Sequence, residues 1–477
     1  MHRIISVLQH EVNFGGNLNW QTRLYKPRDE GELLDILQRH SGETIRALGS
    51  KHSWSNIATD AAVSLDMTGF DTVQPFTRGG QRLVRVGAGV TLQALLDRLH
   101  STTDQTLPTL GAIKKQTISG AISTGTHGSG RQSLSHFVTA LRLAAYDPQT
   151  LRPTIVEYNA GPELKAARCG LGCLGIIVAV DLPTVSKYKV AETLRARASL
   201  HDILRVYADQ PLTQFLWAPY AWKWIAFERK AVDWPAATPF GYLKTSLMRA
   251  YNLIGQDILF HLLLLVSRAL GPQAVKGFLR RSPRLILKNV ERVDDAEHVL
   301  TLAHHLFRHE EMELFVAEER IVEAAEIIRV AVEVFAAHDG RIPEEVELRL
   351  AAMGFGDEPL LRPGRYVHHY PIIFRRVLPD DTMVSMAASI DGPIYSISLF
   401  TYDPPGKRQH FYDFCAFVAH ILRKRCNARL HWGKHFPLTY EDIAPLYPEI
   451  EKFRALCHHN DPSGVFRNRY TKRVLAL

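Results

Sequence analysis

One short stretch of the chain combines residue types that can hold an anionic cofactor and react with it: Gly49-Ser50-Lys51-His52-Ser53-Trp54-Ser55. It follows a predicted strand, Thr44–Leu48, where the chain must turn. A glycine at such a turn lets the backbone approach a ligand closely, and the hydroxyl side chains around His52 can donate hydrogen bonds. The pattern indicates a cofactor clasped by backbone amides, with a histidine beside it.

Two further glycine-rich stretches have the same character. Gly120–Gly130 carries four glycines among serines and threonines, but it matches neither the GxxxxGK[ST] phosphate loop nor the GxGxxG fingerprint. Its N–H groups and small hydroxyls suit a pyrophosphate. Gly170–Ile177 places three more glycines ahead of an apolar strand. The three stretches together favour one large, phosphate-containing ligand.

Short strands and amphipathic helices alternate between residues 20 and 185 and place these stretches at strand ends. The predicted strands are Thr44–Leu48, Ala62–Leu65, Leu83–Val86 and Leu141–Tyr146, and the predicted helices are Glu30–Arg39 and Leu92–Leu99. This alternation is typical of an α+β domain. Residues 296–338 are mainly helical around a strand, Met312–Val316, and Tyr366–Ile373 and Ile394–Tyr402 are further predicted strands.

Composition places the chain among soluble globular proteins, with 46% hydrophobic and 22% charged residues. The net charge is +8, but lysines and arginines are spread along the chain without a dense run, so no nucleic-acid partner is expected. The five cysteines form no CxxC pair, which favours a reduced, cytoplasmic protein without a disulfide framework. No metal site is expected.

One apolar run, Ile258–Val266, is shorter than the roughly 20 apolar residues that span a bilayer. A buried helix is the first interpretation. The alternative is a helix that lies on a membrane surface, because basic residues follow as far as Lys288. A membrane contact through residues 258–288 therefore stays open.

The glycine stretches belong to a longer pattern that covers nearly the whole chain. Its segments are Asn19-Trp20, Gly49–Ser53, Gly87-Ala88-Gly89, Ser119–Gly130, Gly170–Ile177, His431–Phe436 and Asp461–Asn468. Together they resemble the vanillyl-alcohol-oxidase type of FAD enzymes, within it the branch of sugar-1,4-lactone oxidases and alditol oxidases. The resemblance implies an α+β, two-domain fold. An FAD-binding domain would occupy residues 1–188 and a mixed α/β substrate (cap) domain 189–435, with a C-terminal segment, 436–477, returning to the FAD domain.

The resemblance also assigns cofactor contacts. His52 stands where many members bond a histidine ring nitrogen to the 8α-methyl carbon of the flavin, so covalent FAD is expected. The residues expected to contact FAD are Gly49, Ser50, Lys51, His52, Ser53, Gly111, Ser119, Gly120, Ser123, Thr124, Gly125, Thr126, His127, Gly128, Gly172, Gly175, Ile176, Ile177, His431 and Lys434.

Three residues are expected to be catalytic. Lys434 would stabilise the negative charge that develops as the flavin accepts hydride. Glu347 and Arg349 would share one face of a strand and meet the substrate, as a Glu-x-Arg pair does in the alditol relatives. A charged, solvated helix face is the alternative for this pair. Leu399 stands where alditol oxidase has a histidine, which weakens the alditol interpretation.

The implied activity is FAD-dependent oxidation of a CH–OH group, with hydride transfer to flavin N5. An aldono-1,4-lactone is the first substrate class and an alditol the second. Dioxygen, reduced to hydrogen peroxide, is the expected acceptor. The alternatives are a dehydrogenase that passes electrons to a cytochrome or quinone near a membrane, and a flavin-binding protein without turnover.

Overall fold

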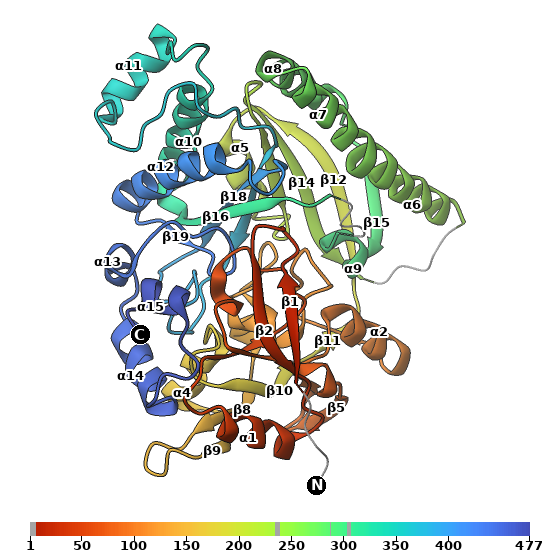
Figure 1. Ribbon diagram of the computed structural model, residues 1–477. Coiled ribbons are helices and arrows are strands. Elements are labelled where there is room, and N and C mark those ends of the chain that lie inside the picture. Colours follow the sequence, from red (N-terminus) through yellow and green to blue (C-terminus); the bar gives the residue numbers. More distant parts are fainter. Residues whose placement is uncertain (1–5, 234–238, 287, 303–306) are drawn as a thin grey trace.

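The computed structural model describes residues 6–233, 239–286, 288–302 and 307–477. Two sheets form the lower half of the molecule in Figure 1. The first has the order β1 (Val7–Val12), β2 (Asn19–Tyr25), β4 (Val63–Asp66) and β3 (Ile45–Leu48). The second, antiparallel throughout, has the order β5 (Val73–Arg78), β6 (Gln81–Gly87), β10 (Ile176–Pro183), β8 (Ala140–Tyr146) and β9 (Pro153–Tyr158). A short pair, β7 (Gln105–Thr106) and β11 (Val185–Ser186), lies beside them.

Four helices accompany these sheets: α1 (Glu30–Arg39), α2 (Leu92–Thr102), α3 (Ile118–Ser123) and α4 (Gly161–Arg168). The side chains of Asp29 and Thr91 cap α1 and α2 by accepting from a backbone N–H three residues further on. Both helices bury leucines and isoleucines at helical spacing. The helices and strands predicted between residues 20 and 185 are thus confirmed to within a few residues.

A second body, in the upper half of Figure 1, is built on an eight-stranded antiparallel sheet. Its order is β15 (Glu291–Asp295), β12 (Lys189–Arg197), β14 (Lys223–Val232), β13 (Gln214–Ala218), β17 (Ile372–Val377), β18 (Ile394–Thr401), β16 (Glu310–Ala317) and β19 (Arg429–Leu430). Its helices include α5 (Leu200–Val206), α9 (Ala296–Leu300), α10 (Ile321–Phe335), α11 (Glu344–Met353) and α12 (Gln409–Cys426). Every residue of β18 is buried, so this strand is covered on both faces.

The strand predicted at Tyr366–Ile373 begins later than expected, because β17 starts at Ile372. Pro371 has no N–H to give to a sheet ladder, which explains why the strand cannot begin before it. β19 likewise ends at Leu430, so Lys434 lies in the following turn and not on a strand.

A helical rod runs along the outer edge of the large sheet (Figure 1). It consists of α6 (Pro239–Tyr251), a π-helical stretch (Asn252–Leu259) and α7 (Phe260–Ala269), with α8 (Pro272–Arg281) packed against α7. The first interpretation of Ile258–Val266, a buried helix, is wrong, because Leu259, Leu262, Leu263, Leu265 and Val266 of this run are exposed. No helix among the described residues combines the length and apolarity needed to cross a membrane.

The chain ends with α13 (Tyr440–Ile443), α14 (Ile450–Asn460) and α15 (Arg469–Leu475), and the loop between α14 and α15 contacts the first sheet. The backbone N–H of Ile45 donates to the carbonyl of Val465 (2.9 Å), and the Arg46 guanidinium donates to that of Phe466 (2.7 Å). Val465 and Phe466 are buried in the same core as α1 and α2. These contacts bring the C-terminal segment back against β3.

Candidate active site

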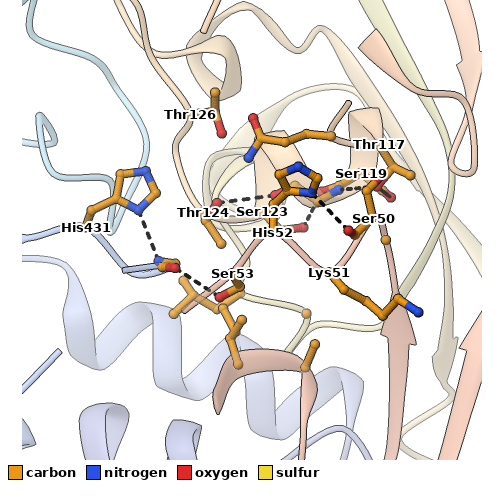
Figure 2. Close-up of a pocket in the computed structure, with 18 of the residues that line it drawn as sticks. Ser50, Lys51, His52, Ser53, Thr117, Ser119, Ser123, Thr124, Thr126 and His431 are labelled. Carbon is orange, nitrogen blue, oxygen red and sulfur yellow. Dashed lines mark hydrogen bonds between the residues drawn. The ribbon is translucent and has the colours of Figure 1, made fainter. Parts of the chain in front are cut away.

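A cleft of about 1300 Å³, open space at its mouth included, lies between the two bodies. Residues from the stretches 46–58, 112–127 and 171–177 line one side, and Glu313, Arg375, His431, Gly433 and Lys434 line the other. Figure 2 shows His52, Ser53 and the serines and threonines of α3 gathered on one side, with His431 opposite. The structure thus brings together motifs that are almost 400 residues apart in the sequence.

Seventeen of the twenty expected FAD contacts line this cleft. They are Gly49, Ser50, Lys51, His52, Ser53, Ser119, Gly120, Ser123, Thr124, Thr126, His127, Gly172, Gly175, Ile176, Ile177, His431 and Lys434. Gly111, Gly125 and Gly128 do not line it. Gly111 instead packs against Thr126, where a Cβ would lie 2.4 Å from the methyl carbon Cγ2 of the threonine.

The side of the cleft formed by β3, the loop after it and α3 is called the cradle here. Its shape requires the backbone at two glycines to lie very close to neighbouring segments. A Cβ at Gly49 would lie 2.5 Å from Oγ1 of Thr117, the residue that caps α3. Gly175 has φ +140, and a Cβ there would lie 2.6 Å from the carbonyl oxygen of Ala144. Glycine is therefore required at both positions.

Three hydrogen bonds tie the cradle to the late turn. Ser53 Oγ (3.0 Å) and the backbone N–H of Trp54 (2.8 Å) both donate to the carbonyl of Gly433. Ser55 Oγ donates to the carbonyl of Trp432 (2.6 Å). These bonds therefore join the two sides of the cleft.

His52 lines the cleft and stacks on Phe14, with 5.0 Å between ring centroids. Its Nδ1 must donate to the carbonyl of Ser50 (2.9 Å), because a carbonyl can only accept. The lone pair of the neutral ring is then on Nε2. Burial lowers the pKa of His52, which favours this neutral form.

The opposite side of the cleft is called the floor here, and it consists of buried ionisable groups around β16. Lys434 Nζ forms an ion pair with Glu311 and lies 4.4 Å from the ring centroid of Trp54. Glu313 lies 3.3 Å from Nε2 of His127 and 3.8 Å from a guanidinium nitrogen of Arg375.

Burial by itself acts to raise the pKa of both floor carboxylates, Glu311 and Glu313. Their charged neighbours differ, however, so the two pKa values shift in opposite directions. For Glu313, the attraction of His127, Lys434 and His431 outweighs burial, and the pKa falls well below its ordinary value. For Glu311, burial and the neighbouring Glu313 outweigh Lys434, so the pKa is raised. The floor therefore holds one firmly ionised carboxylate beside one that binds protons more readily.

His431 completes the floor. Its Nδ1 accepts the backbone N–H of Gly433 (3.0 Å), and burial lowers its pKa to about 3. Ligating atoms of His127, Glu313 and His431 lie within 4.8 Å of one another, a spacing that would also allow them to hold a cation. One of the two His431 nitrogens is already used by Gly433.

Two expected catalytic residues lie elsewhere. Glu347 and Arg349 are on helix α11, and neither lines the cleft. The guanidinium of Arg349 instead binds Glu326, Glu333 and Glu345 on the surface. The prediction of a strand is wrong, because glutamates fill the first turn after Pro343 and Gly354, at φ 73, ends the segment as a helix does.

Leu399 is buried in β18 and does not line the cleft either. The sequence analysis also missed Glu311, Glu313 and Arg375. The available signal was a pair of acidic residues, one on each side of Met312 where the predicted strand Met312–Val316 begins, and an arginine two residues after the predicted strand Tyr366–Ile373.

Comparison with known proteins identifies the two bodies. A family model described as an FAD binding domain matches residues 22–152, and one described as D-arabinono-1,4-lactone oxidase matches residues 180–474. A long-chain alcohol oxidase from an uncultured marine euryarchaeote is 36% identical over 97% of this chain and 96% of its own. An L-gulono-1,4-lactone dehydrogenase of Mycobacterium tuberculosis is 27% identical over 95% of each chain, and the L-gulonolactone oxidase of Mus musculus is 26% identical over 94% of each.

Solved structures support the same fold. Cholesterol oxidase from Brevibacterium sterolicum superposes with a TM-score of 0.71 over 99% of this chain and 97% of its own, at 15% identity. The cleft has room for a dinucleotide, and its glycine cradle fits FAD. The expected α+β fold and FAD as cofactor are confirmed. The chain belongs to the vanillyl-alcohol-oxidase type of FAD-dependent oxidoreductases, in the branch of the gulonolactone and arabinonolactone oxidases.

Proposed function

We propose that this protein is an FAD-dependent oxidase of an alcohol whose CH–OH carbon carries a long apolar chain. The observation that carries this proposal is a row of aromatic rings that leads from the cleft to α7. The relative named as a long-chain alcohol oxidase, at 36% identity, also supports it.

The aromatic row consists of Trp54, His309, Tyr402 and His261. Trp54 lines the cleft beside Lys434, and its ring centroid lies 5.2 Å from that of His309. His309 lies 5.4 Å from Tyr402, which lies 4.9 Å from His261 on α7. An alkyl chain can pack along such rings, whereas a sugar lactone would leave hydroxyl groups against them without partners.

The floor offers the groups that the reaction needs. When bound, FAD supplies the acceptor for the hydride that leaves the carbinol carbon. Nδ1 of His127 donates to the carbonyl of Gly128 (2.9 Å), so Nε2 faces the Glu313 carboxylate at 3.3 Å. We assign Nε2 of His127 to take the proton of the substrate hydroxyl, and the ionised Glu313 carboxylate then stabilises the imidazolium that forms. Lys434 and Arg375 stabilise the negative charge that develops as the flavin accepts the hydride.

His52 is the proposed attachment point of the flavin, through Nε2, and dioxygen the proposed acceptor. An aldono-1,4-lactone stays as the second candidate substrate. It is favoured by the family model that matches residues 180–474 and by the charged floor, whose glutamates and arginine can bind sugar hydroxyls.

A substrate panel tests the proposal. We expect 1-dodecanol, but not L-gulono-1,4-lactone or xylitol, to bleach the flavin absorbance anaerobically, and to form hydrogen peroxide in air. Bleaching by the lactone alone would establish the second candidate. Acid precipitation should leave a yellow pellet for the wild type and a colourless one for His52→Ala; yellow pellets from both would exclude His52 as the attachment point.

A further inference from the structure

We infer that the rod α6–α7 and the adjacent α8 form a face that binds the surface of an anionic lipid bilayer. This face is called the helical edge here. The inference deepens the proposed function and rests on it for one point only, the delivery of an apolar alcohol from the bilayer to the cleft. Binding of the bilayer itself stands on the observations below.

The helical edge leaves a group of large apolar side chains exposed. Leu270 is 75% exposed and Val266 57% exposed, whereas His261 and Leu264 on the inner side of α7 are buried. The exposed apolar residues of the edge are Leu247, Ile254, Leu259, Leu262, Leu263, Leu265, Val266, Leu270 and Leu285. These nine are among the seventeen large apolar residues exposed on the described chain, and their concentration on one edge marks an interaction surface.

The same segment carries most of the net charge of the protein. Residues 239–290 contain eight lysines and arginines and one acidic residue, Asp257, a formal +7 where the whole chain carries +8. Arg280, Arg281 and Arg284 are exposed and form no ion pair with a described residue. Apolar side chains flanked by cations match a bilayer surface, where the leucines enter the acyl boundary and the arginines meet anionic headgroups.

A bilayer explains the edge better than a second copy of the chain. A two-fold contact brings the same residues of both copies together, so it would place Arg280, Arg281 and Arg284 of one copy close to the same three arginines of the other. The contact is peripheral, because no described helix is able to cross a membrane. Its inner side continues into the aromatic row, since His261 lies on α7 one residue before the exposed Leu262. The aromatic row therefore reaches from Trp54 in the cleft to the inner side of the helical edge.

Vesicle co-sedimentation of the flavin-loaded protein tests the inference. We expect the wild type to sediment with phosphatidylcholine vesicles that contain about a quarter phosphatidylglycerol and to bind pure phosphatidylcholine vesicles at least about tenfold more weakly. The variant Leu262→Glu/Val266→Glu and the variant Arg280→Glu/Arg281→Glu/Arg284→Glu should each bind at least about tenfold more weakly than the wild type.

Leu348→Glu is the matched control, because Leu348 is 65% exposed but lies on α11. It should bind vesicles as the wild type does, and all variants should keep their flavin and their activity on a short, water-soluble alcohol. Equal vesicle binding by Leu262→Glu/Val266→Glu and Leu348→Glu, or no binding by the wild type, would overturn the inference. A wild-type dimer in light scattering that Leu262→Glu converts to a monomer would assign the edge to a second copy. Binding without any alcohol oxidation would leave the inference standing and reject the proposed function.

Discussion

The two sides of the cleft are built on opposite principles. The cradle consists of glycines, serines and threonines from the loop after β3 and from α3, and its contacts are mainly backbone and hydroxyl groups. The floor consists of buried charges, with Glu311 and Glu313 on β16 opposite Lys434 and Arg375. From this comparison we expect flavin binding to depend mainly on the cradle and turnover mainly on the floor. Substitutions should therefore change flavin content or turnover, but rarely both.

The largest effect is expected from Glu313→Gln on the floor. The substitution keeps the shape of the side chain but removes the carboxylate that faces His127, so we expect kcat to fall by about 10³-fold. The flavin content should not change. Steady-state kinetics, expressed per bound flavin, measure the difference.

Glu318→Gln is the control, because Glu318 lies just beyond β16 and binds Arg376 outside the cleft. It should retain the wild-type kcat. A Glu313→Gln variant that loses flavin but turns over normally would break the division between cradle and floor.

The next effect is expected from Gly49→Ala in the cradle. The new Cβ would meet Thr117 Oγ1 at 2.5 Å and push the loop away from α3. In a His52→Ala background, where FAD binding is reversible, we expect the Kd for FAD to rise by about tenfold. Titration of the apoprotein with FAD measures this change. Gly42→Ala, where a Cβ meets nothing within 4 Å, should leave the Kd unchanged.

A smaller effect is expected from a change of pH. It should lower the stability of the body built on the eight-stranded sheet, which carries the floor. His368 and His369 are buried there, and burial lowers the pKa of each to about 3. The folded protein excludes a proton that the unfolded chain binds below its ordinary pKa of 6.5. The contribution of these two neutral histidines to the free energy of unfolding is therefore fully present above pH 6.5, and it is lost as the pH falls from 6.5 toward 3.

We expect the free energy of unfolding to fall, below pH 6.5, by on the order of 1 kcal/mol per histidine for each pH unit. Urea unfolding followed by tryptophan fluorescence measures it, since Trp217, Trp222 and Trp224 lie in this body. His368→Phe should reduce the dependence, because neither ring nitrogen of His368 bonds a described residue. An unchanged slope in this variant would show that His368 titrates normally.

The smallest effect is expected from Arg349→Ala. Arg349 is part of a surface network on α11, so we expect kcat to change by less than about twofold and stability by less than about 1 kcal/mol. Kinetics and a melting curve of one preparation check both values. A large loss of turnover with normal flavin content would show that Arg349 takes part in the reaction.

The sequence analysis was successful where the chemistry is local. Gly49–Ser53 and Ser119–Gly130 are consecutive residues, and their composition alone indicates a ligand loop. The charged pair Glu313 and Arg375 of the floor could not be predicted in the same way, because the two residues lie on different strands that only the folded sheet brings together. The spacing of Glu347 and Arg349 fitted a strand, but Pro343 and Gly354 enclose a helix of ten residues. The run Ile258–Val266 was apolar enough for a core, and sequence alone does not say which elements cover a helix.

The hydrogen bonds from Ser53, Trp54 and Ser55 to Trp432 and Gly433 have a consequence for biosynthesis. The ribosome makes the cradle early, but its second wall is only finished when residues 431–434 have been translated and Val465 has paired with Ile45. Until residues 431–434 and Val465 have folded against the cradle, the cleft lacks its second side. We therefore expect the protein to bind flavin stably only after these late segments have been made and have joined the cradle.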